Sequence, residues 1–197
     1  MIAGLLRPTR GVVKVCGYDM AAQPVQAKEL MSYVPDQPYL YEKLTGREFL
    51  RFIADIYKLE PDVAAFKVKA MADEFGLEEF ADQLTENYSH GMKQRVVMAA
   101  AMIHDPKVIV IDEPMVGLDP RSARSLKDIF RQKAREGTTI FMSTHTLSVA
   151  EELADRVGII DKGDLVALGT ISQLQSRARV EGRLEDVFLA ITEGASV

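Results

Sequence analysis

The apolar run at residues 108–111, Val-Ile-Val-Ile, constrains the fold more than any other segment of the chain. It places an aliphatic side chain on both alternating faces, so a strand formed here must be covered on both sides. Strands of this kind are typical of parallel sheets enclosed between layers of helices. Two adjacent carboxylates, Asp112 and Glu113, follow the run directly. Ligands of open α/β sheets bind beyond the carboxyl ends of the strands, so the acid pair marks a candidate site.

Strand and helix patterns alternate around this run. We expect further strands at residues 12–15, 31–34 and 138–142, the last of them a second buried strand like residues 108–111. A hairpin of residues 157–160 and 165–168 is expected to turn at Lys162-Gly163. Helices are expected from the capping-box residue Thr45 onward, once or twice within residues 62–84, and at residues 89–103, 121–135, 147–154 and around 184–191. This alternation predicts an α/β domain with a mostly parallel sheet.

Composition limits the classes of protein to consider. The chain has 197 residues, 47% of them hydrophobic, which is enough for one domain with a core of its own. A net charge of -5 without a basic stripe argues against a nucleic-acid partner. The longest apolar run, residues 96–103, is far shorter than the roughly 18 to 20 residues that a membrane span requires. A single cysteine, Cys16, excludes an internal disulfide; we expect a reducing compartment and a core position for this side chain.

The acid pair and a nearby polar triplet are the first candidates for chemistry. At the end of a buried strand, Asp112 is placed to hold Mg²⁺ and Glu113 to orient an attacking water. The competing interpretation is a strand that runs into an acidic turn. Ser143-Thr144-His145 follows the strand expected at residues 138–142, where a histidine can reach a phosphate oxygen. A lone histidine at a strand end is more often structural, but its position next to the acid pair favours a role.

Two turns that open helices are further candidates. Residues 88–95, Tyr-Ser-His-Gly-Met-Lys-Gln-Arg, place free backbone amides at a helix start, which suits an anion. The alternative is an ordinary cap by Ser89. Similarly, Asp119-Pro120 indicates either a functional turn or only the start of the next helix. His90 and His104, taken separately, are interpreted as surface or packing residues.

Taken in order, these segments resemble the ATP-binding subunit of ABC transporters. YSHGMKQR, VIVIDEP, GLDP and STH stand in the order of the signature, Walker B, D-loop and H-loop motifs of that family. Residues 33–37 resemble the Q-loop, and residues 184–188 resemble a tail of the export-type branch. The resemblance implies a P-loop NTPase-like, mostly parallel sheet flanked by helices. It further implies an ATPase domain over residues 1–170, with a helical subdomain at about 45–104 that carries the signature, and a short tail over residues 171–197.

The family resemblance assigns a role to each matching position. It implies that ATP lies between two head-to-tail subunits, with Mg²⁺ as cofactor. The implied partners are a second ATP-binding subunit and a transmembrane permease, on the cytoplasmic face of the membrane. The implied residues are Asp112 for Mg²⁺, Glu113 as general base, His145 on the γ-phosphate, Ser89 and Gly91 on the γ-phosphate across the dimer, Asp119 in communication between the sites, and Gln37 in the Q-loop.

The sequence departs from the family pattern in three respects, two at single positions and one in a missing motif. His90 stands where the signature has its first glycine, while Gly91 retains the second. The Q-loop position falls on Asp36 when aligned on Leu40-Tyr41, and Gln37 follows it. The phosphate loop, G-x-x-x-x-G-K-[ST], does not occur in this sequence. Residues 1–11 resemble the end of the helix that follows that loop, so we expect an N-terminally incomplete domain with missing strands, an open sheet edge and weak ATP binding of its own.

The sequence leaves two alternatives to a transporter ATPase. One is a soluble ABC ATPase of DNA repair or translation, although the coiled-coil insertion or second domain usual in such proteins is not visible here. The other is a non-catalytic remnant that occupies the dimer interface. The presence of Glu113 argues against the remnant, because only hydrolysis requires this residue. The transported substrate is not readable from the chain.

Overall fold

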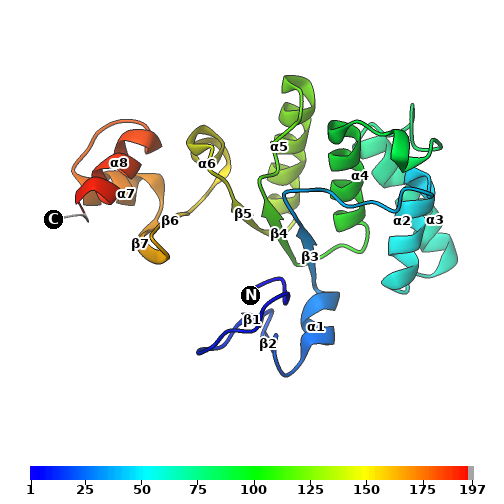
Figure 1. Cartoon of the computed structure of the whole chain (residues 1–197), viewed down its shortest axis with the longest axis horizontal. Helices are drawn as coiled ribbons and strands as arrows, with labels where there is room; N and C mark the ends of the chain where they lie inside the picture. The colour runs from blue at the N-terminus through cyan, green and yellow to red at the C-terminus, as the bar shows by residue number, and fades with distance from the viewer. Residues whose placement is uncertain (195–197) are drawn as a thin grey trace. The chain divides into compact units, whose positions relative to one another are not determined.

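The computed structural model describes residues 1–194. These residues belong to two compact units, residues 1–143 and residues 144–194 (Figure 1). The functional division expected at residue 170 stays a prediction. Among the described residues, no helix is long and apolar enough to cross a bilayer.

A parallel three-stranded sheet organises the first unit, in the order β3 (Met31–Val34), β4 (Val108–Asp112) and β5 (Thr139–Ser143). Val34 pairs with Ile111, and Ile111 with Met142, so the three strands end at one edge. Ile109 and Ile111 of the central strand are buried. The expected parallel α/β core, with residues 108–111 at its centre, is therefore confirmed.

Strand β5 is less buried than its sequence suggested. Its residues alternate between exposed and half-buried, and the ring of Phe141 is 52% exposed. Within the described residues, β5 pairs only with β4. The expectation of a second strand buried on both faces is therefore wrong for this unit, because burial depends on which elements cover each face.

Three helices pack on one another beside the sheet: α2 (Gly46–Ile56), α3 (Pro61–Glu74) and α4 (His90–Met102) (Figure 1). Thr45 caps α2 in a full capping box with Glu48, as its spacing predicted. Helix α4 also contacts β3, so it connects the helical cluster to the sheet. A short 3-10 turn, η1 (Thr85–Asn87), precedes α4, and α5 (Pro120–Arg135) packs on β5.

The N-terminal region differs from expectation in three places, the first of which is the strand expected at residues 12–15, limited here to Lys14–Val15. Residues 1–11 form turns and bends instead of a helix end, because so short a segment forms too few backbone hydrogen bonds to offset the cost of helix nucleation. Strands β1 (Lys14–Val15) and β2 (Tyr18–Asp19) form a hairpin followed by α1 (Pro24–Glu29). Cys16 lies exposed in that hairpin turn at a φ of 49°, so its expected core position is wrong.

The second unit contains α6 (Leu147–Leu153), the antiparallel hairpin β6 (Val157–Asp161) and β7 (Asp164–Gly169), α7 (Ile171–Ala178) and α8 (Leu184–Gly194). The hairpin at Lys162-Gly163 and the helix around residues 184–191 are confirmed. Helix α7 was not predicted. The core of this unit consists of Ile159, Ala167, Leu174, Leu184 and Val187.

Candidate functional site

The carboxyl edge of the sheet holds Asp112 in a defined orientation. The Ser143 hydroxyl donates a hydrogen bond of 2.6 Å to Asp112 Oδ1, from the strand that pairs with β4. Asp112 is half-buried, and one of its oxygens thus has a fixed donor. No group of three or more His, Cys, Asp or Glu among residues 1–194 is arranged to hold a metal ion. A single oriented carboxylate fits Mg²⁺, which proteins commonly hold through one or two carboxylates together with substrate phosphates and water.

Glu113 adopts an uncommon backbone conformation directly after β4. Its φ is 47°, in the left-handed region that residues with a side chain seldom occupy. Its amide donates to the carbonyl of Ser143 at 3.0 Å, so the turn is tied to the end of β5. Strained backbone of this kind is concentrated at functional sites. The conformation therefore supports the candidacy of Glu113 beyond what the acid pair alone indicated.

The segment after β3 ends at the same edge. Because β3 is parallel to β4 and in register with it, Asp36 and Gln37 follow Val34 beyond the edge where Asp112 follows Ile111. Both side chains are exposed. The assignment of the Q-loop role to Gln37 stays a prediction, with Asp36 as the alternative.

His145 lies two residues beyond β5 in the chain and belongs to the second compact unit. The turn around it is locally ordered, because the Thr146 amide donates to Thr144 Oγ1 at 3.0 Å. The phosphate contact expected of His145 stays a prediction.

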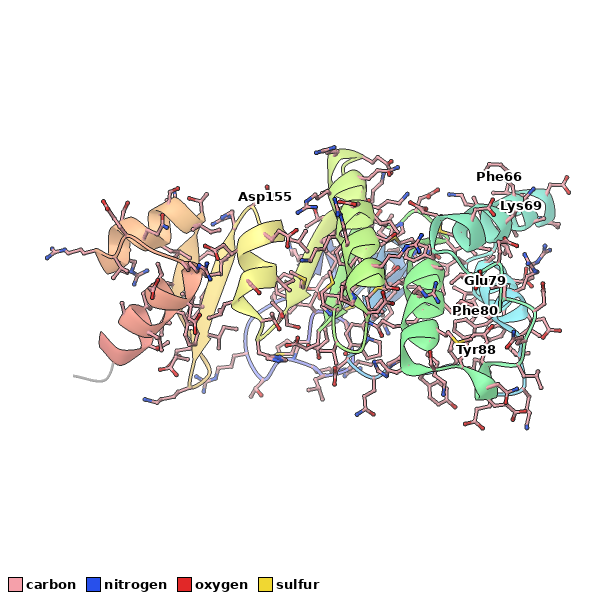
Figure 2. The ribbon with its side chains drawn as sticks, turned by 90° about the horizontal axis from the view of Figure 1, so that it is seen from above. Phe66, Lys69, Glu79, Phe80, Tyr88 and Asp155 are labelled. Carbon is pink, nitrogen blue, oxygen red and sulfur yellow. The ribbon has the colours of Figure 1, made fainter. Side chains whose placement is uncertain are left out.

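The turn before α4 is anchored by a buried tyrosine. Tyr88 Oη donates to the carbonyl of Phe80 at 2.7 Å and accepts from the Gly46 amide at 3.1 Å. Its ring meets Phe80 edge-on, with the centroids 5.0 Å apart; Figure 2 labels both residues in the helical region. Ser89 then caps α4, with Oγ accepting from the Met92 amide at 3.3 Å. The cap that stood as the alternative to an anion-binding turn is therefore present, and Tyr88 fixes the place where α4 begins.

A pocket of about 400 Å³ brings the two helix starts together. Its lining residues come from the start of α4 and from the segment that leads into α5: Ser89, His90, Gly91, Met92, Arg95, Gly117, Asp119 and Ser122. Gly91 approaches the other segment closely, because a β-carbon at this position would lie 3.3 Å from the Gly117 carbonyl oxygen. The structure thus unites Ser89, Gly91 and Asp119, which the sequence named separately.

Asp119 is the N-cap of α5. Its Oδ1 accepts from the amides of Arg121 at 2.9 Å and Ser122 at 3.1 Å, and its Oδ2 accepts from the Ser122 hydroxyl at 2.5 Å. The bond from the Ser122 side chain is the largest cause that lowers the pKa of Asp119, followed by its backbone amide. The expected helix start is confirmed, whereas the role of Asp119 in communication stays a prediction.

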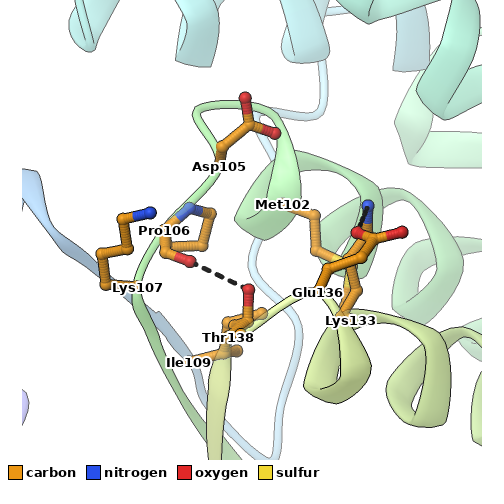
Figure 3. Close-up of a pocket in the computed structure, with 9 residues that line it drawn as sticks. Met102, Asp105, Pro106, Lys107, Ile109, Lys133, Glu136 and Thr138 are labelled. Atoms are coloured by element: carbon orange, nitrogen blue, oxygen red, sulfur yellow. Dashed lines mark hydrogen bonds and ion pairs between the residues drawn. The ribbon is translucent and has the colours of Figure 1, made fainter.

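A second pocket, of about 160 Å³, lies at the opposite, amino end of β4 and β5 (Figure 3). Lys133 pairs with Glu136 at 3.3 Å, and Lys67 pairs with Asp105. The Thr138 hydroxyl donates to the Pro106 carbonyl at 3.3 Å. Both acids that line this pocket are thus paired with lysines, and the candidate residues lie at the other end of the strands.

Two contacts of the candidate site were not predicted from the sequence. The ring of His90 lies against Gly117 through its Cδ2 edge, and the side chain of Gln94 reaches the carbonyl of Pro114. Neither has a signature in local spacing, because each joins α4 to a segment beyond β4. His104 is a packing residue, as expected: its ring stacks on Tyr57, with the centroids 3.5 Å apart and the planes 9° apart.

Comparison with known proteins relates this arrangement to a family. Residues 1–116 match the family described as ABC transporter. The chain is 36% identical to the linearmycin resistance ATP-binding protein LnrL of Bacillus subtilis (strain 168), over 90% of this chain and 57% of LnrL. It is 32% identical to the ABC transporter ATP-binding protein NatA of the same organism, over 96% of this chain and 77% of NatA.

A solved structure described as the ATP-binding subunit of an ABC transporter superposes with a TM-score of 0.91 at 31% identity. That match covers 96% of this chain and 80% of the other. The mixed α/β fold with a parallel sheet is therefore shared with an ATP-binding subunit of known structure. The chain spans little more than half of the length of LnrL, at 57%.

Proposed function

The chain belongs to the ATP-binding family of ABC transporters, and from this premise we propose that it supplies the hydrolytic residues of an ATPase that powers a membrane exporter. Its sequence contains no phosphate loop, so we expect weak ATP binding by this chain itself. The observation that carries the proposal is the carboxyl edge of the sheet. There the Ser143 hydroxyl orients Asp112, and Glu113 follows in a strained turn bonded to the same β5 residue. This edge is where open α/β sheets bind ligands.

Each candidate residue has one proposed role. Asp112 would hold Mg²⁺, which when bound neutralises charge on the β- and γ-phosphate oxygens. Glu113 accepts a proton from the attacking water or orients it, and His145 contacts the γ-phosphate. Ser89 and Gly91 present the first-turn amides of α4 to the γ-phosphate of an ATP held by a second subunit, because free amides at a helix start attract anions.

The partners of the chain are proposed from the same family resemblance. A second ATP-binding subunit completes each site, Asp119 takes part in communication between the two sites, and the segment with Gln37 contacts a transmembrane permease. The assembly would place the chain on the cytoplasmic face of the membrane. Export is proposed because the name of LnrL denotes resistance to linearmycin, and resistance commonly follows from removal of a toxic compound.

The test replaces the proposed general base. Glu113→Gln, in the complex with the permease, should lower the rate of ATP hydrolysis by at least about 100-fold, since general bases contribute about 10²–10⁴. The variant should still bind ATP and should accumulate as an ATP-dependent dimer in size-exclusion chromatography. Glu79→Gln is the matched control, because Glu79 is exposed among the helices (Figure 2). This variant should hydrolyse ATP at the rate of the unmodified chain.

Three results would contradict the proposal. Undiminished hydrolysis by Glu113→Gln would remove Glu113 from the role of base. Failure of the chain to co-purify with any membrane subunit, combined with full ATPase activity alone, would favour a soluble ABC ATPase. Absence of hydrolysis in the unmodified complex would favour a non-catalytic subunit.

A further inference from the structure

One face of α4 is packed against the segment that joins Glu113 to Asp119. The contacts come from His90 and Gly91 at the start of the helix and from Gln94 one turn later, which helical spacing places on a common face. On the other side they reach residues 114–118, directly after the strained turn at Glu113.

The imidazole of His90 lies against Gly117. A β-carbon at position 117 would overlap Cδ2 of His90 and would lie 2.8 Å from its Nε2, so the imidazole occupies the space that a side chain would take. Gly117 also has a φ of 76°, which disfavours any residue with a side chain. The segment therefore bends sharply at Gly117, with the Cδ2 edge of the imidazole against it.

Gln94 makes the second contact of this face. Its side chain is 1% exposed, and Nε2 donates to the Pro114 carbonyl at 3.5 Å. Its Oε1 is buried without a hydrogen-bond partner among the described residues. The hydrogen bond to the Pro114 carbonyl is thus the polar contact that holds this buried amide. Pro114 directly follows Glu113 in the chain.

We propose that His90 and Gln94 act as positioning residues, which clamp residues 114–118 to α4 and thereby fix Glu113 of the same chain. The start of α4 would then serve two ATP sites. It offers Ser89 and Gly91 to the site completed across the dimer, and through His90 it orders the catalytic turn of its own site. The consequence for catalysis rests on the proposed function, whereas the clamp itself does not.

The clamp is tested by hydrogen exchange of backbone amides in the nucleotide-free protein. Val116 donates to Glu113 at 3.3 Å and Leu118 to Met115 at 3.4 Å, so both amides report on the order of the segment. His90→Ala should raise their exchange by about tenfold, because local opening governs exchange at such sites. Lys93→Ala, which truncates a half-buried side chain in the same helical turn, should leave both amides unchanged.

His90→Phe separates ring packing from imidazole chemistry. Phenylalanine keeps a planar ring beside Gly117 but has no ring nitrogen, so the clamp predicts exchange at Val116 and Leu118 close to that of the unmodified chain. Exchange as fast as in His90→Ala would show that the ring alone does not hold the segment. Equal exchange in His90→Ala and the unmodified chain would overturn the clamp.

The action on the chain's own Glu113 is tested in mixed dimers of two differently tagged copies, one of which carries Glu113→Gln. The remaining activity then uses Glu113 of the other copy. Positioning within one chain predicts that His90→Ala lowers kcat at least threefold, with the KM for ATP unchanged, only when placed in the copy that retains Glu113. A lower kcat when His90→Ala is placed in the Glu113→Gln copy would instead indicate a contact across the dimer. That result would overturn the positioning role.

The two proposals fail separately. If the unmodified dimer does not hydrolyse ATP, the proposed function fails, while the exchange data still decide whether the clamp exists. If hydrolysis is normal and the amides of Val116 and Leu118 exchange equally fast in His90→Ala and the unmodified chain, the clamp fails and the proposed function stands.

Discussion

The hydroxyl of Ser143 donates a 2.6 Å hydrogen bond to a carboxylate oxygen of Asp112, across the two strands that end side by side. Two neighbouring strands thus contribute to the placement of one carboxylate. The same serine also accepts the Glu113 amide through its backbone carbonyl, at 3.0 Å. Residue 143 therefore orders both members of the acid pair.

Ser143→Ala should impair the use of Mg²⁺ more than the binding of ATP. Loss of a hydrogen bond to a carboxylate costs about 1 kcal/mol at a partly exposed site, which corresponds to roughly a fivefold higher Mg²⁺ concentration at half-maximal hydrolysis. The measurement is a Mg²⁺ titration of ATPase activity. Ser176→Ala is the control, because Ser176 donates to the Ser172 carbonyl within α7. An unchanged Mg²⁺ requirement in Ser143→Ala would argue against Asp112 as the magnesium ligand.

Asp119 allows its role as a helix cap to be separated from its proposed role in communication. Asparagine caps helices about as well as aspartate, so Asp119→Asn should keep the thermal midpoint near that of the unmodified chain. Asp119→Ala should lower the midpoint, because the amides of Arg121 and Ser122 lose their acceptor. If the carboxylate is needed between the sites, both variants lose ATPase activity. Full activity in Asp119→Asn would reduce this residue to a cap.

A cap elsewhere in the chain provides the control for these variants. Thr170→Ala removes the side-chain acceptor for the Gln173 amide at the start of α7. It should lower the thermal midpoint without lowering the rate of hydrolysis in the part that remains folded. Equal losses of activity in Thr170→Ala and Asp119→Ala would show that activity follows stability alone.

His104 predicts a loss of stability in mild acid. Burial lowers its pKa from 6.5 to about 4, so the folded chain keeps the ring neutral where the unfolded chain protonates it. The unfolded state therefore binds more protons between pH 6.5 and 4. The free energy of unfolding should fall as the pH drops through this window, with the full contribution present above pH 6.5.

His104→Phe keeps the stack on Tyr57 but removes the titration. Urea unfolding from pH 7 to pH 4 should show a shallower loss of stability in this variant. One proton sets a ceiling of about 1.4 kcal/mol per pH unit, and partial exposure of the ring reduces the effect below it. The same pH slope in both proteins would show that other groups account for the acid sensitivity.

The parts of the fold that local chemistry determines were predictable. Thr45 and Glu48 satisfy the first amides of α2 by themselves, and residues 108–111 carry their own pattern of burial. Helix α7 was missed although Thr170 and Gln173 form the same capping box, because Leu174 is its only buried residue and leaves little apolar periodicity. The core position expected for Cys16 was wrong. Cys16 and Gly17 form the turn of the β1–β2 hairpin, which leaves the Cys16 side chain exposed although apolar residues precede it.

The candidate site was predictable only as separate segments. Strand ends placed Asp112 and Glu113, and helix-start chemistry placed Ser89 and Asp119. The pocket that joins Ser89, Gly91 and Asp119 depends on how α4 packs, and that packing involves the buried side chain of Gln94. No spacing rule connects Gln94 with Pro114, since the contact forms only once α4 and β4 are both in place.

The backbone conformation at Glu113 has opposite consequences for stability and for catalysis. A non-glycine residue at a φ of 47° costs about 1 kcal/mol or more relative to glycine, which adopts this region freely. A library of position-113 variants selected only for resistance to heat should therefore drift toward glycine or asparagine. The same library selected for growth that depends on transport should keep glutamate, so the enriched residue shows which pressure governs this turn.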